Sequence, residues 1–310
     1  MTTLEKYSYI FGHLKVSRSS GGVAPHKPVL LLAIIGEFEE GLIFTNGICI
    51  TPTLVARFKD VWNSLVINEI YQPRFYLPFY HLKTSQFWEL VPKFGRMISL
   101  TSSNSPKSFR QLKSEIEYSL INKDLFELLI DPISRATLRN VLLETYFDCE
   151  FLKITRSILD KAVEQILNEP PAEYRQMAMG FDEEEIYIRS SVFKKTIPNI
   201  YNNSCSISGL RIMANDKIQM IDACHIIPFS HSHDDTISNG ISLCPNLHRA
   251  FDRGLIAIDD NYNVVIKSFV ENDNIYSIRQ FEGVKIYLPE NEKFHPSKEN
   301  LSWHRNYFQF

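Results

Sequence analysis

The 310-residue sequence has five cysteines but no CxxC pair, and it has no long apolar run. Scattered thiols in odd number exclude the disulfide framework of small secreted proteins, so we expect reduced cysteines. The most apolar stretch, PVLLLAIIG from Pro28 to Gly36, is far shorter than the ~20 residues of a membrane-spanning helix. The N-terminus lacks the apolar core of a signal peptide. We therefore expect a soluble, cytoplasmic protein with no membrane partner.

Neither sign of charge is in large excess. Lys and Arg number 33 against 36 Asp and Glu, a formal net charge of −3. The first 150 residues hold 16 cations and 15 anions (+1), and the rest hold 17 and 21 (−4). This balance excludes a histone-like polycation, but it allows DNA binding through a local basic groove. The length predicts two domains.

Hydrophobic spacing and turn residues predict a mixture of helices and strands in the first half of the chain. The expected elements are a buried helix from Pro28 to Gly41, a hairpin at 42–53 with an Asn46-Gly47 turn, a helix at 51–65, an extended or looped aromatic stretch at 71–82, a strand at 87–91, helices over 108–167 and an exposed linker at 168–185.

The most informative stretch runs from Cys205 to Asp260. A β-branched, alternating segment predicts a strand at 220–227 that carries His225 near its end. Asn239 follows in a loop, and Pro245 starts a helix that carries His248. This order suits metal-assisted phosphodiester hydrolysis. A neutral His can act as general base, a single divalent ion can stabilise the phosphate, and a loop Asn can orient the base.

These motifs resemble the HNH (ββα-metal) nucleases, in the branch reading DAxHIIP, NGxxLCxxxH and FDxG. The resemblance implies that His225 is the general base, Asn239 the orienting residue and His248 a metal ligand, with Mg²⁺ or Mn²⁺ as cofactor. The residue before the base, often an acid or His in the family, is Cys224 here. Asp222 and Asp252 are the candidates for the other metal ligand, and we favour Asp222. Ser208 and Leu247 stand where zinc-bearing members have cysteines, so no structural zinc is expected.

Residues 8–147 resemble the sulfur-binding domain of McrA-type restriction endonucleases, which reads phosphorothioate-modified DNA. The resemblance rests on the APHKP segment before the Leu run, on LPFYHL and FWEL, and on DPISRATLRNVLLETYF. The resemblance implies a pocket at Pro78 that prefers sulfur, a large and poorly solvated atom, while cations hold the phosphate charge. Leu77 and His81 depart from the usual tyrosine and small residue of that pocket. The expected DNA-binding residues are Lys15, Arg18, His26, Lys27, Arg74, Pro78, Phe79, Tyr80 and His81.

We predict an α+β fold made of a mixed helix and sheet DNA-recognition domain (1–150), a helical connector (151–188) and a C-terminal HNH nuclease domain (189–310). The predicted function is a modification-dependent restriction endonuclease acting on double-stranded, phosphorothioate-modified DNA. Two alternatives stay open. One is an HNH endonuclease that reads another base modification or plain sequence, and the other is a non-catalytic DNA-binding or regulatory protein. The sequence also leaves open whether the chain is a homodimer built on the helices of 108–167.

Overall fold

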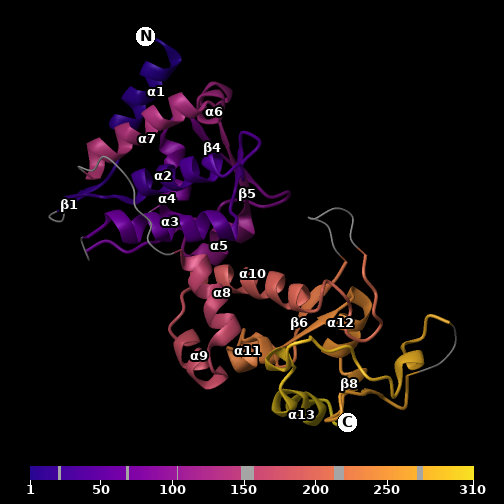
Figure 1. Cartoon of the computed structure of the whole chain (residues 1–310). Coiled ribbons are helices and arrows are strands. Elements are labelled where there is room, and N and C mark those ends of the chain that lie inside the picture. The colour runs from indigo at the N-terminus through magenta and orange to yellow at the C-terminus, as the bar shows by residue number, and fades with distance from the viewer. Residues whose placement is uncertain (20–21, 68–69, 103, 148–156, 213–219, 271–274) are drawn as a thin grey trace. The chain divides into compact units, whose positions relative to one another are not determined.

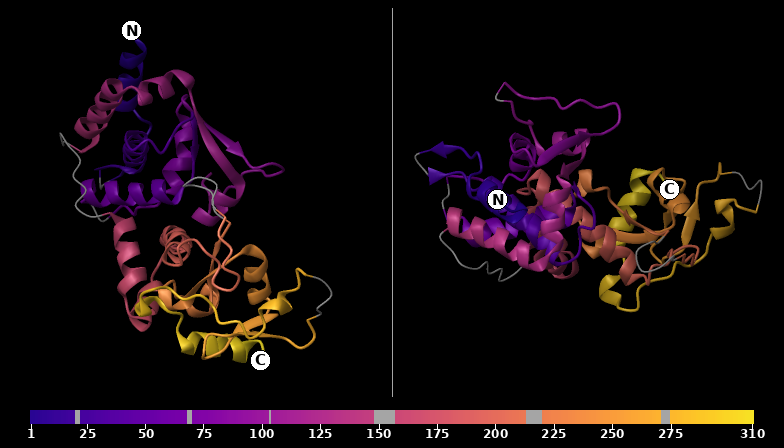
Figure 2. Two further views of the ribbon diagram at one scale, coloured as in Figure 1. Left: turned by 45° about the vertical axis from the view of Figure 1, so that its right-hand side comes forward. Right: turned by 90° about the horizontal axis from the view of Figure 1, so that it is seen from above.

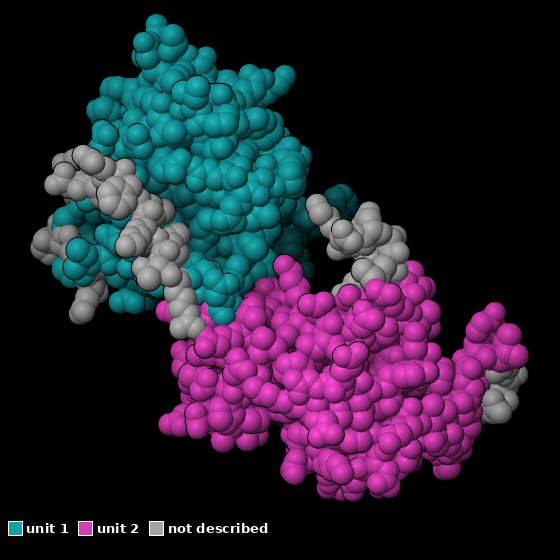
Figure 3. Space-filling view, in the orientation of Figure 1, with its two compact units in different colours: residues 1–160 teal, residues 161–310 magenta. Residues whose placement is uncertain are grey.

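The computed structural model describes residues 1–19, 22–67, 70–102, 104–147, 157–212, 220–270 and 275–310. The chain divides into two compact units, residues 1–160 (unit 1) and residues 161–310 (unit 2), which Figure 3 colours separately. Helices and short antiparallel sheets occur in both units, so the fold is α+β, as the sequence predicts. Within the described ranges, no helix has the length and apolarity needed to span a membrane.

Unit 1 is built mainly of helices, with one two-stranded and one three-stranded sheet (Figures 1 and 2). Its elements are α1 (Thr3–Gly12), β1 (Arg18–Ser19), β2 (Gly22–Val23), α2 (His26–Glu39), β3 (Gly47–Cys49), α3 (Pro52–Leu65), α4 (Tyr76–His81), η1 (Leu82–Thr84), β4 (Trp88–Pro92), α5 (Phe109–Glu115), β5 (Ile116–Ile121), α6 (Lys123–Ile130) and α7 (Pro132–Phe147). α8 (Ile158–Asn168) spans the division between the units.

The apolar run predicted as a buried helix forms α2, which is buried on nearly every side. α2 packs on α3, α4 and α7. The helix is followed by Gly41, whose φ of +64° places it in the left-handed region that glycine adopts without a steric penalty. The three-stranded sheet has the order β3-β5-β4, and both strand pairs are antiparallel.

Three expectations for unit 1 are wrong. The segment 42–53 forms no hairpin, because β3 pairs with the distant β5, which itself lies inside the stretch predicted to be helical. The stretch at 71–82 was predicted to be extended or looped, but it contains the helix α4. Pro78 is tolerated there because it stands in the first turn, where backbone N–H groups have no partner within the helix.

Unit 2 places a helical segment before the two strands and the helix of the predicted nuclease motif. Its elements after α8 are α9 (Pro171–Ala178), α10 (Glu183–Ile200), β6 (Asp222–His225), α11 (Phe229–Ser232), η2 (Ile237–Asn239), β7 (Gly240–Leu243), α12 (Pro245–Asp252), β8 (Ile256–Ile258), β9 (Val264–Ile266), η3 (Ile278–Phe281), η4 (Glu292–Phe294) and α13 (Lys298–Tyr307).

The segment 168–185 is not an exposed linker. It contains α9, and it ends in the capping box at the start of α10, where the Asp182 side chain accepts from the backbone N–H of Glu185 and the Glu185 side chain accepts in return. Tyr174 in α9 is fully buried. The Pro pair and the acidic run predict a linker, but both are also ordinary helix-start signals.

The strands β6 and β7 pair antiparallel, α10 packs on both, and α12 follows β7 directly. Figure 1 shows this strand–strand–helix arrangement beside α10. β6 is shorter than the strand predicted at 220–227, because the chain turns away from β7 after His225. The predicted helix from Pro245 to Asp252 is confirmed as α12.

Candidate functional site

His225 ends strand β6, opposite Gly240 at the start of β7. Its imidazole stacks on the ring of Phe193 from α10, with ring centroids 3.9 Å apart and planes 5° from parallel. Gly240 makes this approach possible. A Cβ at that position would lie 2.3 Å from Cδ1 of Ile197 and 3.1 Å from Cε2 of Phe193. The missing side chain therefore lets α10 close on the strand pair and hold the histidine ring.

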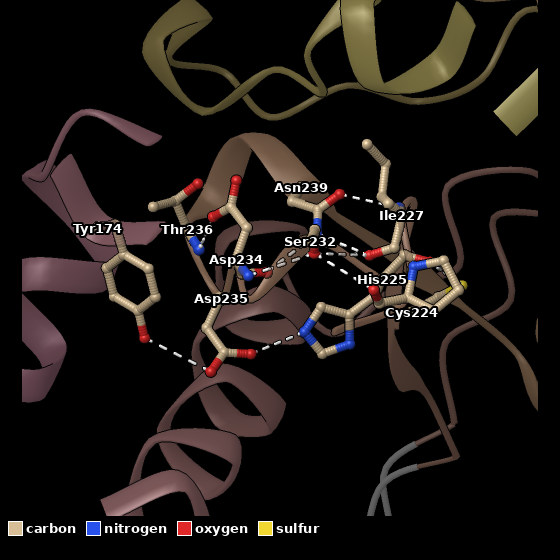
Figure 4. A network of polar contacts seen from close by, with 10 residues as sticks. Tyr174, Cys224, His225, Ile227, Ser232, Asp234, Asp235, Thr236 and Asn239 are labelled. Carbon is tan, nitrogen blue, oxygen red and sulfur yellow. Dashed lines mark hydrogen bonds and ion pairs between the residues drawn. The ribbon is translucent and has the colours of Figure 1, made fainter. Parts of the chain in front are cut away.

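The Nε2 atom of His225 lies 2.8 Å from Oδ1 of Asp235 (Figure 4). Asp235 is 2% exposed, and its other oxygen accepts a hydrogen bond of 3.4 Å from the Tyr174 hydroxyl. A buried carboxylate needs hydrogen-bond partners, and the histidine and the tyrosine supply them.

Asn239 joins the two ends of the loop between β6 and β7. Its Oδ1 accepts from the Ile227 backbone N–H at 2.9 Å, and its Nδ2 donates at 2.9 Å to the carbonyls of both Ile227 and Asp234 (Figure 4). The side chain is fully buried. Asn239 therefore fixes the backbone directly after His225.

His248 lies on α12 between two carboxylates. Its Nδ1 is 3.2 Å from Oδ2 of Asp222, and its Nε2 is 3.4 Å from Oδ2 of Asp252, one helical turn further on. The Cys224 thiol donates to Oδ1 of Asp252 at 3.7 Å. The structure thus brings together both carboxylates that the sequence offers as metal ligands.

Cys224, His248 and Asp252 each have one potential ligand atom within 4.8 Å of those of the other two. Carboxylate oxygens suit Mg²⁺ and Mn²⁺, imidazole suits borderline ions such as Zn²⁺, and a thiolate suits softer ions. Burial, followed by the charge of Asp252, raises the pKa of Cys224 well above its usual value, so the thiol keeps its proton. With the thiol protonated, the imidazole of His248 and the carboxylate of Asp252 remain as ligands for a divalent ion, and Asp222 can orient the imidazole from its other nitrogen.

A pocket of about 550 Å³ opens on unit 1. Apolar side chains and cations line it together, and the lining includes five of the nine predicted DNA-binding residues: Lys15, His26, Lys27, Pro78 and His81. Leu77, Ala24 and Val16 contribute further apolar surface. The pocket draws on α2, α4 and the chain before β1.

Lys27 is the buried cation of this pocket, with an exposed fraction of 8%. Its Nζ donates to the Lys15 carbonyl at 2.6 Å and to Oγ1 of Thr84 at 3.0 Å. Burial and, to a smaller extent, the charge of Lys15 lower its pKa to about 8. Two protein acceptors leave one ammonium proton for a ligand.

The two pocket histidines differ in their partners. His26 Nε2 is 2.9 Å from the Gln72 carbonyl, and its ring packs edge-on against Trp62. His81 Nε2 is 2.9 Å from the Ser105 hydroxyl. Burial lowers the pKa of both rings, and nearby cations lower it further. Both histidines therefore favour the neutral form at pH 7.

Phe79, Tyr80 and Arg74 are not among the described residues that line the pocket. Phe79 and Tyr80 are at most 1% exposed and belong to the core of unit 1. Arg74 is exposed, and its charge lowers the pKa of His26. Arg18 belongs to β1, and its side chain is outside the described residues.

Asp235 and Phe193 contact His225, and Tyr174 contacts Asp235, but the sequence pattern does not single out any of the three. Asp235 lies in a polar loop, where the sequence pattern predicts that acidic residues belong to turns. Tyr174 lies in the segment interpreted as a linker, and Phe193 is ten residues or more from every motif residue. The one available signal was the helical spacing that places Phe193 and Ile197 on the same face of a helix.

Comparison with known proteins bears on unit 2. Residues 205–259 match the family model described as HNH endonuclease. Unit 2 therefore contains an HNH endonuclease domain, a class that hydrolyses phosphodiester bonds, as the sequence predicts. Comparison with curated proteins gave no match.

The solved structures to which the chain is similar include restriction endonucleases and a domain of one of them. The modification-dependent TagI restriction endonuclease is 23% identical over 39% of this chain and 38% of that chain, with a TM-score of 0.31. The sulfur-binding domain of ScoMcrA complexed with phosphorothioated DNA is 19% identical over 46% and 87%, with a TM-score of 0.35. The Type IV phosphorothioation-dependent restriction endonuclease ScoMcrA is 11% identical over 78% and 93%, also at 0.35. The chain thus matches less than two fifths of the TagI chain.

Proposed function

We propose that this protein is a modification-dependent restriction endonuclease in which unit 1 reads phosphorothioate DNA and unit 2 hydrolyses a nearby phosphodiester bond. The observation that carries the cutting role is the constellation of His225, Asn239 and His248 within the HNH match. The observation that supports the reading role is the unit 1 pocket, which combines apolar walls with a buried lysine.

In the proposed reaction, His225 takes a proton from the attacking water, and Asn239 keeps the loop after it in place. His248 and Asp252 would hold the divalent ion, and Asp222, which the sequence favours as the ligand, would orient the His248 ring. When bound there, a divalent ion stabilises the charge that develops on the phosphate and on the leaving 3′ oxygen.

In the proposed reading step, the sulfur of a phosphorothioate lies against the ring of Pro78 and the side chain of Leu77. Sulfur is more polarizable than oxygen and less well solvated, so an apolar wall favours it over an ordinary phosphate oxygen. The third ammonium proton of Lys27 then holds the remaining charged oxygen.

Matched supercoiled plasmids, one with phosphorothioate linkages and one without, test the proposal in the presence of Mg²⁺ or Mn²⁺. We expect cutting of the modified plasmid only, and no cutting by a His225→Ala variant. Equal cutting of both plasmids would disprove the modification dependence. Absence of cutting with either plasmid and either metal would instead argue for a non-catalytic DNA-binding protein.

A second candidate is an HNH endonuclease that reads a modified base. It is favoured by the polar contact between His81 and Ser105 in the pocket wall, because paired donors and acceptors suit a base edge better than a sulfur atom. Competition binding with thioated, methylated and unmodified duplexes separates the two candidates, since only one of the modified duplexes should then compete.

A further inference from the structure

The hydrogen bonds of His225 divide its two ring nitrogens into separate roles. Nε2 faces the Asp235 carboxylate at 2.8 Å, whereas Nδ1 has no hydrogen-bond partner among the residues that the structure describes. A carboxylate can only accept, so neutral His225 must carry its proton on Nε2. The lone pair on Nδ1 then remains available to a water molecule.

Asp235 is itself held from the segment that precedes the HNH match. Its Oδ2 accepts from the hydroxyl of Tyr174 in α9. The Tyr174 ring lies 5.6 Å from the Arg189 guanidinium, and Arg189 donates at 2.6 Å to Gln165 of α8. Burial and, next, the charge of Asp235 raise the pKa of Tyr174, so the hydroxyl keeps the proton that it donates.

The fold around Asp235 also shows why this carboxylate rather than its neighbour matters. Asp234 is equally buried, but its side chain accepts from the backbone N–H of Thr236 at 2.8 Å and completes a turn. The two adjacent acids therefore have different partners (Figure 4). One closes the loop, and the other reaches the catalytic histidine.

We propose that Asp235, fixed by Tyr174, is a positioning residue that holds His225 as the Nε2–H tautomer with Nδ1 directed to the attacking water. The proposal rests on His225 being the general base. It makes α9 and α10 a working part of the nuclease, since Tyr174 holds the carboxylate from one side and Phe193 holds the imidazole plane from another.

The first test is independent of DNA cleavage. Long-range nitrogen–proton NMR spectra of the histidine side chains report the tautomer of each ring, and comparison with a His225→Gln variant assigns His225. In the metal-free full-length protein, at a pH where imidazole is neutral, we expect the Nε2–H form. In Asp235→Asn the amide can donate to Nε2, so we expect the Nδ1–H form. An Nδ1–H signal in the wild type, or no change in Asp235→Asn, would overturn the proposal.

The second test is a double-mutant cycle on cleavage of the plasmid that the wild type cuts. We expect Asp235→Asn to lower kcat about 10–100-fold, with KM for DNA within about twofold. Tyr174→Phe, which removes one hydrogen bond, should cost about fivefold. In a His225→Ala background rescued by added imidazole, Asp235→Asn should have no further effect, because the free base needs no positioning.

The control is Asp234→Asn, which removes a buried charge but keeps an oxygen for the Thr236 N–H. We expect its kcat to stay within about twofold of the wild type. An equal loss in Asp234→Asn, or a further loss from Asp235→Asn after imidazole rescue, would mean that Asp235 acts only on the stability of the loop. Full activity of His225→Ala would refute His225 as the general base, whereas absence of cutting by the wild type would refute the proposed function. The tautomer of His225 is measured without cleavage, so these failures are distinguishable.

Discussion

At the scale of single residues, Asn239 stabilises the loop that follows His225, the proposed general base. It is buried, and its amide makes three hydrogen bonds of 2.9 Å to backbone groups. Removing the amide leaves those backbone groups unsatisfied in the interior, which is more costly than the bonds themselves are worth.

Asn239→Ala should therefore lower the free energy of unfolding by about 3 kcal/mol, since buried polar groups lose their partners. Urea denaturation followed by circular dichroism measures the change. Asn306→Ala, at an exposed position of α13, serves as control and should change stability by less than about 0.5 kcal/mol. A loss in Asn239→Ala no larger than in the control would show that water replaces the amide.

Lys27 makes DNA binding depend on pH in a particular direction. Its pKa of about 8 in the folded protein lies below its usual 10.5, so the ammonium loses its charge as pH rises through 8. The affinity for thioated duplex should fall about tenfold from pH 7 to pH 9, as fluorescence anisotropy can measure. Lys27→Met should bind weakly at both pH values. If the wild-type affinity also stays constant between pH 7 and pH 9, Lys27 does not contact the DNA.

The lowered pKa of Lys27 makes stability depend on pH in the opposite direction from DNA binding. Below pH 8 the folded protein carries a charge that burial disfavours, and this cost is relieved as pH rises from about 8 toward 10.5. Binding and stability thus respond to the same proton in opposite directions.

At the scale of elements, the close packing of α10 on the strand pair depends on Gly240. An added Cβ would meet Cδ1 of Ile197 at 2.3 Å and Cγ1 at 2.8 Å. Ile197 is fully buried and cannot move freely. The same helix carries Phe193, so any displacement reaches the ring of His225.

Gly240→Ala should therefore cost about 1–3 kcal/mol of stability by overpacking and should also lower kcat. The double variant Gly240→Ala with Ile197→Ala removes the clashing atoms. It should recover part of the kcat that Gly240→Ala loses, although Ile197→Ala alone leaves a cavity. Thermal unfolding and plasmid cleavage measure the two effects. Additive losses in the double variant would contradict the steric explanation.

How far the sequence predicts the elements depends on the separation of the partners. α12 follows from Pro245 and the spacing of His248 and Asp252, which are all local signals. β3 has three residues, and its partner β5 is about 70 positions away, so no local pattern could identify the pair. The spacing of His225, Asn239 and His248 predicts the motif, but Asp235 gains its role only from the fold.

At the scale of the whole molecule, the chain has two compact units, and its net charge is −3. The proposed reading pocket lies in the first unit and the HNH domain in the second. If each unit folds around its own core, recognition and cutting can be separated physically.

We predict that residues 1–160 alone bind thioated duplex more tightly than plain duplex. Residues 161–310 alone should cut both plasmids slowly and without preference, because HNH chemistry addresses the phosphate backbone. Anisotropy and gel assays measure the two activities. Preference for the thioated plasmid in the isolated second unit would place recognition there and would contradict the proposed division of roles.

The buried amide of Asn239 also affects the chemical stability of the protein during storage. An asparagine before glycine deamidates when the glycine backbone nitrogen attacks the side-chain amide carbon. Here the Gly240 N–H donates to the Ile237 carbonyl, and the Asn239 amide is held at both its oxygen and its nitrogen. The fold therefore protects the side-chain amide carbon of Asn239 from attack, but a transiently unfolded chain loses that protection. A single such event would place a carboxylate in a fully buried position, so storage under mildly unfolding conditions should inactivate the enzyme irreversibly.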